Sequence, residues 1–137
     1  FDIELAKKES SENPVFYIQY AHARICSIHK YSRKKALKLV FRKTDPELLK
    51  TKAETGLIRK LIEFPFAVAS SADALEPNRL LVYLNELASL FHSFYTECRV
   101  VTDDLAMTKA RLFLVECVRI VLANGLGLLN ITFPEKM

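Results

Sequence analysis

Apolar residues recur at helical spacing along most of the chain, and the longest such stretch opens at Asn13 and Pro14. Asparagine caps the free amide groups at a helix start, and proline fits the first helical position without losing a hydrogen bond. At 100° per residue, about one third of the circumference then carries apolar residues and two histidines. This buried stripe comprises Ile18, Ala21, His22, Ile25, Ile28 and His29. The pattern predicts a core-facing helix over residues 13–31.

The same spacing predicts further helices downstream. A cap followed by proline at Asp45 and Pro46 predicts a helix start there, and the apolar pattern continues to Pro65, which cannot donate a backbone hydrogen bond. A short helix is expected over residues 66–74, and a long one opens at Pro77. The residues expected on the buried side of this long helix are Leu80, Leu84, Leu87, Phe91, Phe94 and Cys98.

The last helix is expected over residues 105–125, with Gly125 as a left-handed cap. Its expected inward residues are Ala106, Ala110, Phe113, Leu114, Cys117, Ile120 and Val121. Nothing shows the period-two alternation of strands over a useful length. The predicted fold class is therefore all-α, a helical bundle of about four long helices with one or two short ones.

Composition sets the outer bounds of the molecule. Half of the 137 residues are apolar, and no apolar run reaches the length of about 18 residues that a membrane span needs. We expect one soluble domain over residues 13–137, with residues 1–12 as a short helix and linker trailing from a preceding domain. The chain opens at Phe1 without a secretion signal, and its three cysteines lie far apart. We therefore expect a fragment of a longer protein in a reducing compartment.

A second stripe lies beside the buried one on the first long helix. Tyr17, Tyr20 and Arg24 stand at positions i, i+3 and i+7. Two phenol rings and a guanidinium in this arrangement supply the flat surfaces and the cation that a platform for unpaired bases requires. By spacing alone, packing of the tyrosines at a core edge with a solvated Arg24 is the commoner arrangement.

The positive charge is concentrated near this helix. The net charge is only +4, yet residues 13–44 contain no Asp or Glu. The basic residues of this block are Arg24, Lys30, Arg33, Lys34, Lys35, Lys38, Arg42 and Lys43. Such a block attracts polyanions, although a solvated basic face is an equal alternative. Residues 32–43 fit either a helix or a loop anchored by Leu37, Val40 and Phe41.

Other chemistry receives little support. His22, Cys26 and His29 have a spacing that can offer three ligands to zinc, but no fourth ligand is evident, so a packed arrangement is expected. Asp103 and Asp104 precede a helix, where carboxylates usually cap it. We find no glycine-rich phosphate loop and no recognisable nucleophile motif, so the sequence predicts no catalytic site and no metal site.

Residues 13–27, NPVFYIQYAHARICS, closely resemble the segment that opens the carboxy-terminal helical domain of arginyl-tRNA synthetases, the DALR-type anticodon-binding fold. The resemblance extends to VYLNELASLFHSFY at residues 82–95 and to ARLFLV at residues 110–115. It continues through NGLGLLNI at residues 124–131 to the final PEKM. It is weakest in the basic segment, and Asn130 stands where many members have glycine.

The resemblance implies a function in binding the anticodon stem-loop of the tRNA for arginine. It assigns the unpaired bases to Tyr17, Tyr20 and Arg24, with Tyr95 and Met137 as further contacts. For the phosphates, the basic block adds Lys30, Arg33 and Lys34.

The parent protein would then be an arginine-tRNA ligase that uses ATP and Mg. The HIGH-type and KMSKS-type signatures of its catalytic part are absent here, so the fragment should be inactive alone and need no cofactor. The expected partners are the tRNA and the missing catalytic domain, and we expect a cytoplasmic monomer without membrane association. Two alternatives stay open, namely the same domain from another synthetase such as the cysteinyl type, and a helical protein-interaction module.

Overall fold

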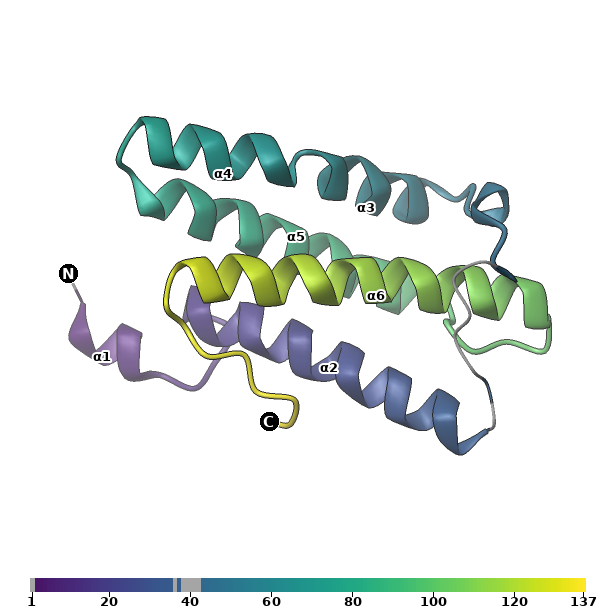
Figure 1. The fold of residues 1–137 in the computed structure, drawn as a ribbon. Coiled ribbons are helices and arrows are strands. Elements are labelled where there is room, and N and C mark those ends of the chain that lie inside the picture. The colour runs from purple at the N-terminus through teal and green to yellow at the C-terminus, as the bar shows by residue number, and fades with distance from the viewer. Residues whose placement is uncertain (1, 36, 38–42) are drawn as a thin grey trace.

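The computed structural model describes residues 2–35, 37 and 43–137 and shows an all-helical bundle (Figure 1). This confirms the predicted fold class. In chain order the elements are α1 (Ile3–Lys7), α2 (Pro14–Lys34), the 3₁₀ turn η2 (Pro46–Leu48), α3 (Lys52–Ile62), α4 (Phe64–Asp73), α5 (Pro77–Glu97) and α6 (Leu105–Leu128).

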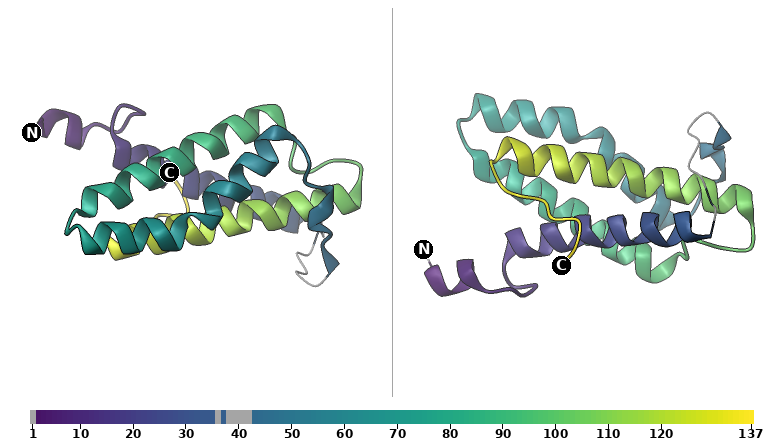
Figure 2. Two further views of the ribbon diagram at one scale, coloured as in Figure 1. Left: turned by 90° about the horizontal axis from the view of Figure 1, so that it is seen from above. Right: turned by 60° about the horizontal axis from the view of Figure 1, so that its bottom comes forward.

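The helices α2, α5 and α6 pack on one another, and α3 and α4 follow each other along α5. Pro65 lies in the first turn of α4, so the break predicted at this proline is real, but α4 begins at Phe64, two residues earlier than expected. The short helix α1 stands apart from the bundle, and the C-terminal tail returns from the end of α6 to α2 (Figure 2). This arrangement leaves one long side of α2 available beside α5.

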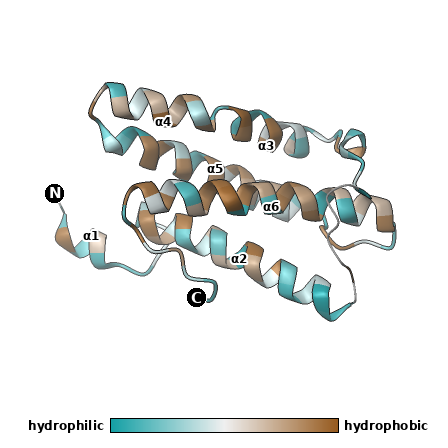
Figure 3. Cartoon of the chain, in the orientation of Figure 1, coloured by the Kyte–Doolittle hydropathy of each residue, from teal (hydrophilic) through white to brown (hydrophobic). Residues whose placement is uncertain are grey.

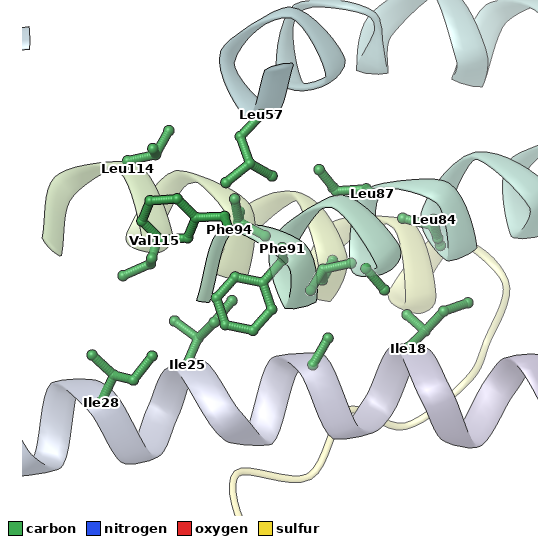
Figure 4. Close-up of a cluster of buried hydrophobic side chains, with 14 of the residues drawn as sticks. Ile18, Ile25, Ile28, Leu57, Leu84, Leu87, Phe91, Phe94, Leu114 and Val115 are labelled. Carbon is green, nitrogen blue, oxygen red and sulfur yellow. The ribbon is translucent and has the colours of Figure 1, made fainter. Parts of the chain in front are cut away.

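The core lies where α2, α5 and α6 meet. Figure 4 shows Phe91 of α5 pointing toward α2, with Ile18 and Ile25 of α2 beneath α5. Phe91 and Phe94 are completely buried, and truncating a buried phenylalanine to alanine costs about 3–5 kcal/mol. The predicted stripes on α2 and α5 are both confirmed, because every residue in them is buried.

The predicted inward face of α6 is partly wrong. Ala110 and Leu114 are buried, but Ala106 and Ile120 are exposed. Buried residues that the pattern missed are Leu112, Val115, Val118 and Leu122. Because α6 packs against α2, α3 and α5, it is apolar along most of its length and no single stripe marks its buried side (Figure 3).

Helix starts follow their caps, with one correction. The Asn13 side chain accepts hydrogen bonds from the amides of Val15 and Phe16, as predicted. Asp45 and Pro46 instead start only the 3₁₀ turn η2, and α3 begins at Lys52. There, Thr51 and Glu54 form a reciprocal capping box that satisfies two free amides, a stronger start signal than a single cap.

The end of α6 also differs from the prediction. The helix continues to Leu128, and the left-handed residue is Asn130, with φ of 56°, while Gly125 is buried inside the helix. The amide of Asn130 donates to the carbonyl of Gly127, and that of Ile131 donates to Leu126. This is a Schellman cap, and asparagine is the usual substitute for glycine at its left-handed position.

The basic segment is only partly described. The helix α2 extends to Lys34, three residues beyond the predicted end. The predictions for Lys38, Val40, Phe41 and Arg42 lie outside the described residues. Within residues 2–35, 37 and 43–137, no helix is long and apolar enough to cross a membrane, and no group of three or more His, Cys, Asp or Glu residues is placed to hold a metal ion.

Candidate nucleic-acid interface

The contact between α2 and α5 brings four of the predicted site residues together. Tyr17, Tyr20 and Arg24 project from α2 toward the last turns of α5, where they meet Tyr95 and His92. We call these five residues the α2–α5 platform. Tyr20 and Tyr95 keep 39% and 37% of their surface exposed, so their rings are available to a ligand.

The imidazole of His92 occupies the centre of the platform. Its centroid lies 4.8 Å from the ring of Tyr17 and 5.7 Å from that of Tyr20, and its plane is within 25° of the Tyr20 plane. Its buried Nε2 has no hydrogen-bond partner among the described residues. Burial lowers the pKa of His92, and the charge of Arg24 lowers it further, so the ring is neutral at pH 7.

Sequence reasoning did not assign His92. The available signal was its position three residues before Tyr95, which puts both side chains on one side of α5. Spacing predicts that His92 and Tyr95 share one side of α5, but it does not predict which residues of α2 that side contacts. The structure therefore adds His92 as the residue that separates and supports the two tyrosine rings.

Arg24 and Tyr95 form a cation–π pair across the two helices. The guanidinium carbon of Arg24 lies 4.8 Å from the centroid of the Tyr95 ring, within the usual range of about 6 Å. No carboxylate of the described residues forms an ion pair with Arg24, so its charge is not neutralised. A planar cation held in this way can meet either a phosphate or a base.

Tyr17 has a different environment from Tyr20. It is half-buried and packs against the hydrophobic core, whereas Tyr20 stands on the outer edge of the platform. The core-edge packing expected from the spacing is therefore confirmed for Tyr17, while the ring of Tyr20 stays exposed and its role in base stacking stays a prediction. Tyr17 supports the platform from below, and Tyr20 presents its ring.

A cavity of about 850 Å³ continues from the platform toward the C-terminal end of α2. Arg24 and Tyr95 form one end of it, and Tyr31 of α2 and Lys35, the residue that caps the end of α2, line it further along. The segment of residues 98–103 closes the remaining side. This volume is within the range of about 300–1,000 Å³ that ligand pockets occupy.

A buried ion pair holds the segment of residues 98–103 in place. The Nε of Arg111 lies 2.7 Å from Oε1 of Glu54, and the Glu54 side chain is completely buried. The Nη1 of Arg111 donates to the carbonyl of Arg99 at 2.7 Å. Burial raises the pKa of Glu54, but hydrogen bonds from Thr51 and Arg111 outweigh it and lower the pKa below its ordinary value. Glu54 is therefore ionised, and Arg111 joins α3, α6 and the cavity wall. Sequence reasoning missed this pair because its partners are 57 residues apart.

The C-terminal tail lies on the other side of α2. The amide nitrogen of the Gln19 side chain donates to the carbonyl of Thr132 at 2.7 Å, and Nδ1 of His22 donates to that of Pro134 at 3.1 Å. Gln19 is two positions after Tyr17, about 200° around the helix. Met137 is 48% exposed at the end of this tail, and the structure does not make it part of the platform.

The three predicted phosphate contacts are exposed on α2. Lys30, Arg33 and Lys34 form no ion pair with the described carboxylates. Arg33 lies nine positions after Arg24, which is half a turn away around the helix. The structure therefore distributes these cations around α2 and does not gather them beside the tyrosines.

Residues 18–137 match the family described as DALR anticodon binding domain. The chain belongs to this family. The match begins at Ile18, one residue after Tyr17, and runs to the end of the chain, so α1 and the first turn of α2 of this DALR domain lie outside it.

Two curated relatives that resemble the chain are arginine-tRNA ligases. The chain is 53% identical to the arginine-tRNA ligase of Symbiobacterium thermophilum over 138 residues, and 52% identical to that of Desulforamulus reducens. Both comparisons cover 100% of this DALR domain and 25% of the relative. The chain therefore spans about a quarter of the length of these enzymes.

Solved structures agree with the fold. The arginyl-tRNA synthetase of Thermus thermophilus superimposes with a TM-score of 0.76 and 31% identity, over 96% of this chain and 22% of that one. A protein from Campylobacter jejuni assigned as an arginyl-tRNA synthetase gives a TM-score of 0.81 and 28% identity, over 100% of this chain and 29% of that one. The overall helical fold of this DALR domain is therefore similar to that of the matching parts of these proteins.

Proposed function

We propose that this chain recognises the anticodon stem-loop of an arginine tRNA, as the carboxy-terminal domain of an arginine-tRNA ligase. The observation that carries the proposal is the α2–α5 platform, in which an exposed Tyr20 ring lies beside the Arg24–Tyr95 pair. Its membership of an anticodon-binding family and the names of its relatives support the same function.

The platform binds unpaired bases by stacking. A base that stacks on an aromatic side chain gains about 1–3 kcal/mol, and Tyr20 offers such a face with His92 and Tyr17 behind it. Because these rings are packed before RNA arrives, little conformational entropy is lost on binding. Arg24 and Tyr95 bind a neighbouring base or phosphate of the same loop. Met137 contacts the loop from the side of α2 on which the C-terminal tail lies.

The phosphates are met by the exposed cations of α2. Lys30, Arg33 and Lys34 form no ion pair with the described carboxylates, so they can neutralise a backbone that passes over the helix. Their distribution around α2 lets them meet phosphates on more than one side of the helix.

The remaining assignments concern the longer protein. Its catalytic part would attach arginine to the tRNA with ATP and Mg, while this domain supplies recognition and binds no cofactor. Residues 1–12 form the trailing edge of that catalytic part. The whole protein acts as a monomer in the cytoplasm, where its three cysteines stay reduced.

Titration with anticodon stem-loops tests this function. The isolated domain should bind the arginine stem-loop more tightly than stem-loops of the same length from other tRNAs. Equal binding of all stem-loops would indicate an unselective RNA-binding domain, and absence of binding would favour a protein-interaction module. Either result contradicts the proposed function.

A further inference from the structure

We propose that the cavity beyond Arg24 receives a second unpaired nucleotide, with Tyr31 as its stacking surface and Lys35 as its phosphate contact. This inference rests on the proposed function and extends the RNA site by two turns of α2. Neither Tyr31 nor Lys35 was assigned a contact by the sequence motif.

Tyr31 continues the tyrosine stripe. It lies seven residues after Arg24 and eleven after Tyr20, so it projects from nearly the same side of α2. Eleven residues of α-helix rise by about 16 Å, several times the 3.4 Å rise between stacked bases. A base that stacks on Tyr20 therefore cannot also reach Tyr31, and the second ring must serve a different nucleotide.

The chemistry at Tyr31 repeats the chemistry at Tyr95. The Nζ of Lys35 lies 5.0 Å from the Tyr31 centroid, and the guanidinium of Arg24 lies 4.8 Å from that of Tyr95. Both pairs line the same cavity of about 850 Å³. One aromatic ring and one cation at each end of a cavity are suited to consecutive segments of a nucleic-acid strand.

Among the described residues, packing against the core does not account for the position of Tyr31. It is 48% exposed and lies outside the hydrophobic core, unlike Tyr17. A tyrosine ring that is exposed to this degree lacks the favourable free energy that burial of its apolar surface would contribute. Binding of a base provides the missing contact.

The opposite wall of the cavity is rigid. The amide of Thr102 donates to Oγ1 of Thr108 at 2.9 Å, and that hydroxyl donates back to the carbonyl of Thr102 at 3.1 Å. Arg111 fixes the carbonyl of Arg99 on the same wall. A nucleotide that enters the cavity therefore meets a preformed surface.

A set of arginine stem-loops with a single abasic site at each loop position tests the inference. We expect the wild-type domain to lose affinity at two separate positions, one for each ring. Tyr31→Ala should weaken binding of the intact loop by at least about fivefold, because base stacking is lost. The affinity of this variant should also be unaffected by the abasic site at one of these two positions, while the abasic site at the other position should still weaken binding.

Two controls identify the cause. Tyr31→Phe keeps the ring and should bind every loop as the wild type does, and Tyr20→Ala should become insensitive at the other abasic position. Provided that the wild-type domain binds RNA, two results would overturn the inference. Tyr31→Ala could bind all loops as tightly as the wild type, or its affinity could fall by the same factor for all of them. Failure of the wild type to bind any stem-loop would overturn the proposed function and this inference together.

Discussion

Three histidines lie in the bundle with different neighbours: His22 and His29 are buried, and His92 is half-buried with its Nε2 atom shielded from solvent. His22 donates to the C-terminal tail, His29 lies 2.9 Å from a carboxylate oxygen of Glu116, and His92 is enclosed by aromatic rings. Burial is the largest influence on each, and it lowers the pKa of all three below the ordinary value. The fold therefore favours the neutral imidazole over the protonated form.

This burial predicts that the domain loses stability under mildly acidic conditions. The unfolded chain binds protons near pH 6.5 and the folded chain only at lower pH, so the stabilisation is complete above about pH 6.5 and falls as pH decreases toward the folded pKa values. Each histidine contributes a slope of at most about 1.4 kcal/mol per pH unit. Urea unfolding between pH 7.5 and 5 measures it.

Two comparisons separate the histidines from the carboxylates. The pKa values of Glu54 and Glu116 lie below their ordinary range, so their stabilisation is lost only below about pH 4.3. His92→Phe should reduce the slope between pH 7 and 5. An unfolding free energy that stays constant over this interval would show that the histidines are not buried as described.

At the residue scale, spacing on one helix predicts which side chains share a face but not what covers them. The positions of Tyr17, Tyr20 and Arg24 in the sequence are enough to predict that they share one side of α2. The division of the two tyrosines into support and contact depends on where α5 places His92, as does the pairing of Arg24 with Tyr95. These relations need the packing of two helices, which a single periodic pattern does not contain.

At the element scale, two of the helical glycines, Gly56 and Gly125, have opposite surroundings. A Cβ at Gly125 would lie 2.5 Å from Cδ2 of Leu84, because α5 and α6 approach closely there. A Cβ at Gly56 in α3 would have no atom within 4 Å. Gly125 therefore serves helix packing, which is why the prediction of a cap at this position was wrong.

Alanine substitution at these positions should change stability in opposite directions. Gly125→Ala should lower the unfolding free energy by about 1–3 kcal/mol, because Leu84 is completely buried and has little room to move. Gly56→Ala should raise it by about 0.5–1 kcal/mol through reduced backbone entropy of the unfolded chain. Chemical denaturation of both variants measures this, and a stabilising Gly125→Ala would disprove the close contact.

The C-terminal tail provides a test of a role assigned by resemblance. Removal of residues 135–137 keeps Pro134 and its hydrogen bond with His22, so the melting temperature should stay within about 2 °C of wild type. Affinity for the stem-loop should fall, because Met137 is lost. Unchanged affinity in fluorescence titration would exclude the end of the tail from the RNA site.

Element boundaries were predictable where one local signal acts alone. Asn13 and Pro77 lie at the starts of helices, as predicted. Asp45 caps only a 3₁₀ turn, because the capping box at Thr51 starts the helix that follows. The inward face of α6 was predicted only in part because several helices surround it. Periodicity identifies a single buried stripe and fails where a helix is buried on more than one side.

For the whole molecule, the excess of cations on α2 predicts a salt-dependent affinity. The logarithm of the binding constant should fall linearly with the logarithm of salt concentration, with a slope of about 0.7 for each single-strand phosphate neutralised. Lys34→Ala should reduce the slope by about this amount. Lys52→Ala, on the exposed first turn of α3, should leave the slope unchanged. A flat salt response in the wild type would exclude the α2 cations from the interface.

The central claim is that the outer edge of the α2–α5 platform receives RNA. Tyr20→Ala tests it through melting temperature and stem-loop affinity measured on the same sample. Because Tyr20 is 39% exposed, melting should change little, while affinity should fall about 5- to 150-fold with the loss of one stacked base. Tyr17→Ala should lower both quantities, because its ring also packs against the core. If Tyr20→Ala instead melts much earlier and its folded fraction binds the stem-loop as wild type does, Tyr20 is a packing residue and the platform is not the RNA site.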